Sequence, residues 1–129
     1  NYAPKDKTQA TYSLDTYEYL GVEMLPIYYA LKKRILNIDS SVKEEYKKLY
    51  IAFKSSTNFV DIVPQKSRLR LSLNIPFTNL LDPREICKDV SELGRWGNGD
   101  VEVGISNLDE LDYIMELIQQ AFDRQIEGV

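Results

Sequence analysis

The region from Leu49 to Asn74 has the clearest pattern in the chain, because apolar and polar residues alternate there in three short runs. The apolar members are Leu49, Ile51 and Phe53, then Val60 and Ile62, then Leu69, Leu71 and Leu73. Alternation with a period of two is typical of strands that bury one face, and the short turn-like segments 55–58 and 64–67 favour antiparallel neighbours. The pattern therefore predicts a three-stranded meander at the centre of the fold.

Helical spacing of apolar residues predicts helices before and after this meander. Residues 23–37 and 107–126 both repeat apolar side chains at the spacing of one helix face. A helix is also expected over residues 82–94, because its start has an aspartate N-cap, a proline at N1 and a glutamate at N3. A capping-box sequence at Ser41 predicts a short helical turn over residues 41–47, just before the first strand.

A fourth strand is expected where Val101, Val103 and Ile105 alternate with Glu102 and Gly104. The predicted fold class is therefore α+β, with a four-stranded, mainly antiparallel sheet in the order α-β-β-β-α-β-α and helices packed on one face. Residues 1–15 are polar and lack periodicity, which predicts a linker or tail. Residues 16–129 are then one α+β domain.

Composition limits the chemistry that the chain can perform. Its 129 residues include one cysteine, Cys87, and no histidine. An internal disulfide, a cysteine-based zinc site and histidine-dependent catalysis are therefore excluded, and we expect no cofactor and no metal site. Cys87 is interpreted as a small buried apolar residue. No apolar run is long enough to cross a membrane, which together with the absence of a signal-peptide pattern predicts a cytoplasmic protein, and the first residue, Asn1, suggests a piece of a longer chain.

Charge is distributed unevenly along the chain. Residues 43–70 contain seven Lys or Arg and three Asp or Glu, whereas residues 100–129 contain eight Asp or Glu and one Arg. The predicted central sheet is therefore basic and the last helix acidic. A solvated surface accounts for this pattern, and a basic sheet face that binds a polyanion is the functional alternative.

The outward side of the predicted sheet is the first candidate site. If the leucines of the third run point inward, Arg68 and Arg70 point outward, in the company of Lys54 and Asp61. A cross-strand salt bridge between Arg70 and Asp61 is the structural interpretation. The functional interpretation is a polar face that holds an anion, since guanidinium groups bind planar anions with two hydrogen bonds.

The glycine-rich segment 94–100, GRWGNGD, is the second candidate site. Its tryptophan, Trp96, either tucks under the sheet or forms an aromatic platform for a base or sugar. The segment follows a predicted helix and precedes a strand, which is the reverse of a phosphate-binding loop. The ligand-binding hypothesis covers both sites and names Lys54, Asp61, Arg68, Arg70, Arg95, Trp96, Asn98 and Asp100.

Several motifs together resemble a bacterial and archaeal family labelled "predicted transport protein": YIAFK, NFVDIVPQK, RLRLSLN, DPRE, CKDVS and GRWGNGDVEV. The resemblance covers about residues 24–126 and implies a domain that often ends longer proteins, including ones similar to restriction nucleases. The positions that it marks are Lys54, Phe59, Asp61, Gln65, Lys66, Trp96, Gly97, Asn98, Gly99, Asp100 and Glu102. The family pattern has histidine where this chain has Arg95, so a role that needs an imidazole does not transfer. No established activity comes with the family.

The leading hypothesis is a non-catalytic accessory domain that binds nucleic acid or a nucleotide-like ligand within a larger protein of the restriction or nuclease type. Its expected partners are that ligand and the other domains of the parent protein, with no membrane. The alternative is a protein-interaction or dimerisation module that uses the acidic last helix or exposed tyrosines. An enzyme is the third hypothesis, and it requires a pocket that joins Asp61, Asp100 and Glu102.

Overall fold

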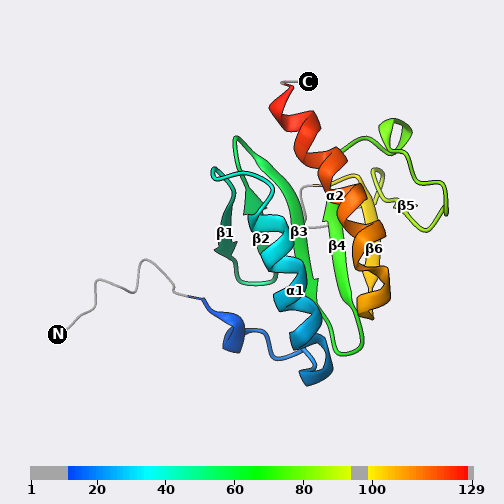
Figure 1. Cartoon of the computed structure of the whole chain (residues 1–129). Coiled ribbons are helices and arrows are strands. Elements are labelled where there is room, and N and C mark those ends of the chain that lie inside the picture. The colour runs from blue at the N-terminus through cyan, green and yellow to red at the C-terminus, as the bar shows by residue number, and fades with distance from the viewer. Residues whose placement is uncertain (1–11, 94–98, 128–129) are drawn as a thin grey trace.

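The sheet of this protein has six strands, all paired antiparallel, in the computed structural model, which describes residues 12–93 and 99–127. The strands are β1 (Lys43–Tyr46), β2 (Ile51–Lys54), β3 (Asn58–Pro64), β4 (Leu69–Leu73), β5 (Lys88–Asp89) and β6 (Val101–Ile105). Their order across the sheet is β1-β2-β3-β4-β6-β5, so that β3 and β4 lie at its centre (Figure 1). The predicted meander is therefore present as β2, β3 and β4.

Two α-helices, α1 (Leu25–Leu36) and α2 (Leu111–Ile126), lie side by side on one face of the sheet (Figure 1). Each follows a short 3-10 turn, η3 (Val22–Met24) and η5 (Leu108–Glu110), respectively. Pro26 occupies the first turn of α1, where its missing N–H costs no hydrogen bond. Both helices agree with the sequence prediction, which placed them within a few residues of these bounds.

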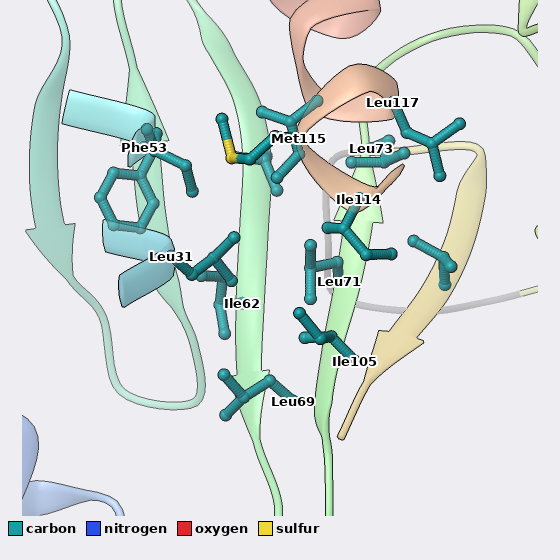
Figure 2. Close-up of a cluster of buried hydrophobic side chains, with 14 of the residues drawn as sticks. Leu31, Phe53, Ile62, Leu69, Leu71, Leu73, Ile105, Ile114, Met115 and Leu117 are labelled. Carbon is teal, nitrogen blue, oxygen red and sulfur yellow. The ribbon is translucent and has the colours of Figure 1, made fainter. Parts of the chain in front are cut away.

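The core lies between the sheet and the two helices. Alternate residues of β4, namely Leu69, Leu71 and Leu73, are fully buried and point toward this layer (Figure 2). Helix α1 contributes Leu31 and α2 contributes Ile114 to the same cluster (Figure 2). The alternation seen in the sequence therefore separates a helix-covered face from a second face, which we call the polar face.

A β-bulge in β3 changes which side chains reach each face. Phe53 pairs with Val60 while Lys54 pairs with Asn58, so Phe59 is an extra residue in the ladder. The ring of Phe59 packs edge-to-face on Phe122 of α2, with 5.2 Å between ring centroids. The bulge thus adds an aromatic side chain to the core.

The prediction of a four-stranded sheet is wrong, and β1 is the first reason. Residues 43–46 pair with β2 instead of forming a helical turn. The Ser41 hydroxyl does not cap a helix, because it donates to the Asp39 carboxylate and lies 2.6 Å from the Ser55 hydroxyl. The carboxylate of Glu44 in β1 accepts a hydrogen bond from the Tyr28 hydroxyl and lies 3.0 Å from the Lys32 ammonium, both on α1. These contacts with distant residues outweigh the local capping-box signal.

The helix predicted over residues 82–94 is also absent from its described part, and β5 takes its place. The Asp82 carboxylate accepts hydrogen bonds from the Cys87 N–H, at 2.8 Å, and from the Tyr113 hydroxyl of α2. Glu85 has φ of 55°, a left-handed conformation that interrupts any helix. Residues 88–89 then pair with β6. The segment is fastened by tertiary hydrogen bonds rather than by helical ones.

Cys87 is half-buried beside the core, as the sequence suggested for a small apolar residue. Burial, with the nearby Asp82 carboxylate, raises the pKa of its thiol to about 12. The thiol is therefore protonated at neutral pH and is a poor nucleophile.

Candidate functional site

The polar face is built by register across four strands. Asp61 of β3 lies opposite Ser72 of β4, Ser72 lies opposite Glu102 of β6, and Glu102 lies opposite Lys88 of β5. Directly opposed residues have Cβ atoms about 4.5–5.5 Å apart, so these side chains form one continuous row. The neighbouring row contains Arg70, which pairs with Val63 on one side and Gly104 on the other.

Two arginines converge on Glu102 within this face. The Arg68 Nη2 atom lies 3.4 Å from Glu102 Oε2, and the Arg70 Nη1 atom lies 3.8 Å from Oε1. Gly104 makes room for this arrangement, because a Cβ atom there would lie 2.8 Å from the Arg68 Nη1 atom. The Arg68 guanidinium is also held by Gln65, whose side-chain oxygen accepts a hydrogen bond from Arg68 Nε at 3.0 Å.

Asp61 is buried on the polar face, with 2% of its surface exposed. Its carboxylate accepts a hydrogen bond from the Asn58 side-chain amide at 3.0 Å, which the bulge in β3 makes possible by placing both side chains on one face. The neighbouring Ser72 hydroxyl is buried and has no hydrogen-bond partner within the described residues. Burying a carboxylate without hydrogen-bond partners would cost free energy. The hydrogen bond from Asn58 to Asp61 therefore indicates a specific polar cluster.

The other predicted site residues are spread over the molecule. Lys54 lies two strands from the arginines, where its Nζ atom is 3.3 Å from Glu45. Asp100 precedes β6, and its backbone carbonyl accepts a hydrogen bond from the Val90 N–H at 2.8 Å. Arg95, Trp96 and Asn98 lie outside the described residues. The structure thus brings Arg68, Arg70 and Asp61 together around Ser72 and Glu102, and it places Lys54 farther along the face.

A pocket of about 820 Å³ adjoins the arginine end of the polar face. Two of its walls are the turn between β1 and β2 and the turn between β3 and β4, and the third wall is the segment 12–19 that leads into η3. Its lining residues are Tyr12, Thr16, Tyr17, Glu18, Tyr19, Lys48, Leu49, Val63, Pro64, Gln65, Lys66 and Arg70. Arg70 therefore belongs both to the polar face and to the pocket.

The tyrosine-bearing wall is fastened to the first turn by Tyr17. Its hydroxyl donates to the Lys47 carbonyl at 2.5 Å and lies 3.0 Å from the Tyr50 carbonyl. Burial of the ring raises the pKa of Tyr17 to about 12, so the hydroxyl stays protonated and keeps donating at neutral pH. One buried side chain thus fixes the position of this wall.

Gly21 fastens the other end of the same segment to the second turn. Its N–H donates to the Gln65 carbonyl at 3.3 Å. The backbones approach so closely that a Cβ atom on Gly21 would lie 2.2 Å from the Lys66 carbonyl oxygen. Only glycine allows this approach, which holds the segment against the turn that carries Lys66.

Cations outnumber acids in the pocket. Lys48, Lys66 and Arg70 line it together with one carboxylate, Glu18. Lys48 and Lys66 are exposed and form no ion pair within the part of the chain that the structure describes. Excess positive charge in a concave site attracts anions and strengthens their binding.

Sequence reasoning did not bring the pocket residues together. The family resemblance marks Gln65 and Lys66, whereas it does not mark Tyr12, Tyr19 or Lys48. The available signal was the density of tyrosine in a segment without periodicity, since Tyr12, Tyr17 and Tyr19 fall within eight residues. That pattern does not reveal which turns the segment contacts.

None of the three carboxylates required by the enzyme hypothesis, Asp61, Asp100 and Glu102, lines this pocket. Among residues 12–93 and 99–127, no cluster of three or more Asp, Glu or Cys side chains is arranged to hold a metal ion. The described helices also include none with the length and apolar character needed to span a bilayer.

Comparison with known proteins gives a family and a relative. A family model described as a domain of unknown function, DUF5655, matches residues 16–125. An uncharacterized protein of Haemophilus influenzae is 44% identical over 95 residues, which make up 74% of this chain and 32% of that relative. The matched region thus spans about a third of the relative's length. No solved structure matches the chain significantly. Neither match carries the transport label or the nuclease context that the resemblance implied.

Proposed function

This chain belongs to the DUF5655 family of domains of unknown function, and we propose that it is a non-catalytic module that binds nucleic acid along the polar face. The family match identifies no reaction, and the partial coverage of the Haemophilus influenzae relative supports a module within a longer protein. Membership of a restriction or nuclease system is part of the sequence-based prediction and needs its own test.

The observation that supports this proposal is the placement of cations along one face. Arg68 and Arg70 project from β4 and its turn, and the pocket that begins at Arg70 adds two lysines. Glu102 holds both arginine side chains in place, so less conformational entropy is lost when they bind a phosphate. Cations fixed at the surface of a sheet suit a backbone of regularly spaced phosphates.

The first test removes the two arginines. We expect Arg68→Ala with Arg70→Ala to weaken binding of a fluorescently labelled single-stranded oligonucleotide. The slope of log affinity against log salt should also fall, by about 0.7 for each phosphate that the protein no longer neutralises. Fluorescence polarisation at several salt concentrations measures both quantities. Lys33→Ala is the control, because Lys33 is an exposed cation of α1 on the other side of the sheet.

A second substitution should change the oligonucleotide affinity in the opposite direction. Glu102→Gln removes the carboxylate that competes with phosphate for Arg68 and Arg70, so we expect tighter oligonucleotide binding. Glu116→Gln, at an exposed position of α2, removes the same charge from the helical side. The polar face does not bind nucleic acid if the arginine variants leave the oligonucleotide affinity and its salt slope unchanged. The same conclusion follows if the two glutamine variants change the affinity equally.

A protein-interaction module is the second candidate, and exposed apolar residues favour it. Leu81 is 74% exposed, and Ile86 and Leu93 are also exposed on the segment between β4 and β6. We expect Leu81→Ser with Ile86→Ser to abolish any self-association. Light scattering coupled to size-exclusion chromatography measures this, and a monomeric parent chain at high concentration would remove the dimer version of this candidate.

A further inference from the structure

We propose that the pocket lined by Tyr19, Lys48 and Lys66 binds one nucleoside phosphate unit, either free or at the end of a strand. This inference rests on the proposed function, because the pocket adjoins the polar face at Arg70. It adds a defined subsite to a surface that would otherwise contact only a phosphate backbone.

The three cations of the pocket can neutralise the phosphate end of such a ligand. Lys48 and Lys66 come from different turns but line the same pocket, and neither forms an ion pair within the described parts of the chain. Arg70, by contrast, already contacts Glu102 at 3.8 Å. The two lysines are therefore better placed to neutralise a terminal phosphate, which carries more charge than a phosphodiester, and Arg70 can continue the contact toward the polar face.

The tyrosines of the pocket wall can stack on the base of the ligand. Tyr19 is 77% exposed although it is aromatic, and Tyr12 lines the same pocket. Exposed rings beside cations are the usual platform for nucleobases, because every base has a π-face that stacks on an aromatic side chain. Leu49, exposed on the facing turn, adds an apolar surface.

Two polar side chains are available for the sugar and the edge of the base. The carboxylate of Glu18 lines the pocket and can accept hydrogen bonds from ribose hydroxyl groups. Gln65 accepts a hydrogen bond from Arg68, with 3.0 Å between Nε and Oε1, and this leaves its NH₂ group available as a donor. The pocket thus offers a partner for each part of a nucleotide.

Size favours one nucleotide over a longer stretch of strand. The volume of about 820 Å³ falls within the range of about 300–1,000 Å³ that is usual for small-molecule and cofactor sites. Its walls include both turns at one end of the sheet.

The test is isothermal titration calorimetry of the whole 129-residue chain with adenosine 5′-monophosphate. Adenosine, ribose 5-phosphate and inorganic phosphate are titrated in parallel. We expect the nucleotide to bind at least about tenfold more tightly than any of the three fragments, since only the nucleotide occupies both the cations and the rings. A 5′-phosphorylated oligonucleotide should compete with it, and the same oligonucleotide without the terminal phosphate should compete less.

Two variants with matched controls locate the binding. Lys48→Ala with Lys66→Ala should weaken nucleotide binding about tenfold or more, whereas Lys33→Ala on α1 should not. Tyr19→Leu should weaken it severalfold while the affinity for inorganic phosphate stays the same. Tyr29→Leu is its control, because Tyr29 is an exposed tyrosine of α1. Thermal unfolding of each variant verifies that it is folded.

The outcomes separate this inference from the proposed function. If oligonucleotides bind through Arg68 and Arg70 but the nucleotide does not, the pocket proposal is wrong and the polar face still binds nucleic acid. Equal affinity for the nucleotide and for inorganic phosphate also contradicts it, because the rings then contribute nothing. If neither nucleotides nor oligonucleotides bind, both proposals are wrong.

Discussion

Contacts of single residues, rather than helix or strand propensity, attach one wall of the pocket to the sheet. Tyr17 is the clearest case, since one buried hydroxyl contacts the carbonyls of Lys47 and Tyr50 in the turn between β1 and β2. Its ring also packs near that of Tyr46, with 6.4 Å between ring centroids. Gly21, four residues later, permits the close approach to Lys66. Removal of either feature should therefore weaken the attachment of a wall of the pocket to the sheet.

We therefore predict that Tyr17→Phe lowers the free energy of unfolding by about 1 kcal/mol at neutral pH, because the variant cannot form the buried hydrogen bond. The pKa of Tyr17 is raised from 10.0 to about 12, so the protonated form stabilises the folded state. That contribution is complete below pH 10 and disappears as the pH rises from 10 to about 12. The variant, which cannot ionise there, should lose less stability over this interval than the parent chain.

Urea unfolding at pH 8, 10 and 11 measures this difference. Tyr29→Phe, at an exposed position of α1, is the control for the loss of a tyrosine hydroxyl. Parallel loss of stability in the Tyr17→Phe variant and the parent would mean that this hydroxyl does not couple to folding.

The elements differ in how far local sequence specifies them. The η5 turn that leads into α2 has strong local signals: the Asn107 side chain accepts a hydrogen bond from the Asp109 N–H at 2.9 Å, and the Glu110 carboxylate accepts one from the Ser106 N–H at 2.8 Å. The segment 82–93 has a comparable start signal, but Asp82 bonds Cys87 and Tyr113 instead. A cap residue predicts a helix only when no distant donor competes for its carboxylate.

The cap of the η5 turn can be tested by substitution. Asn107→Ala should lower the free energy of unfolding by about 1 kcal/mol, because the first turn loses the acceptor for one of its free N–H groups. Ser106→Ala is the neighbouring control, since its backbone N–H alone forms the hydrogen bond to Glu110. Equal effects of the two substitutions, measured by urea unfolding, would show that the cap contributes little.

At the scale of the whole molecule, the fold is a six-stranded sheet with two helices on one face and charged side chains on the other. The helix-covered face supplies the stability, because the buried apolar residues gather there (Figure 2). The polar face and the adjoining pocket are then free to carry charged groups. We therefore expect substitutions of the proposed binding residues to leave the fold intact.

The same division predicts very different costs for two leucine substitutions. Leu71→Ala, at the fully buried centre of β4, should lower the free energy of unfolding by about 2–5 kcal/mol, because it leaves a cavity under the helices. Leu81→Ala, at an exposed position, should change it by less than about 0.5 kcal/mol. Chemical unfolding of both variants provides the comparison, and similar costs would contradict the assignment of the core.

Local sequence was enough to predict the central meander, strand β6 and both long helices, because their apolar periodicity depends only on neighbouring residues. It also placed Arg68 and Arg70 on the face away from the core. Residues 43–46 and 88–89, by contrast, are edge strands for a reason that local sequence does not contain, since these short segments form by pairing with neighbouring strands. The same holds for the pocket that Tyr19, Lys48 and Lys66 share, because contacts between turns that are distant in sequence leave no periodic signal.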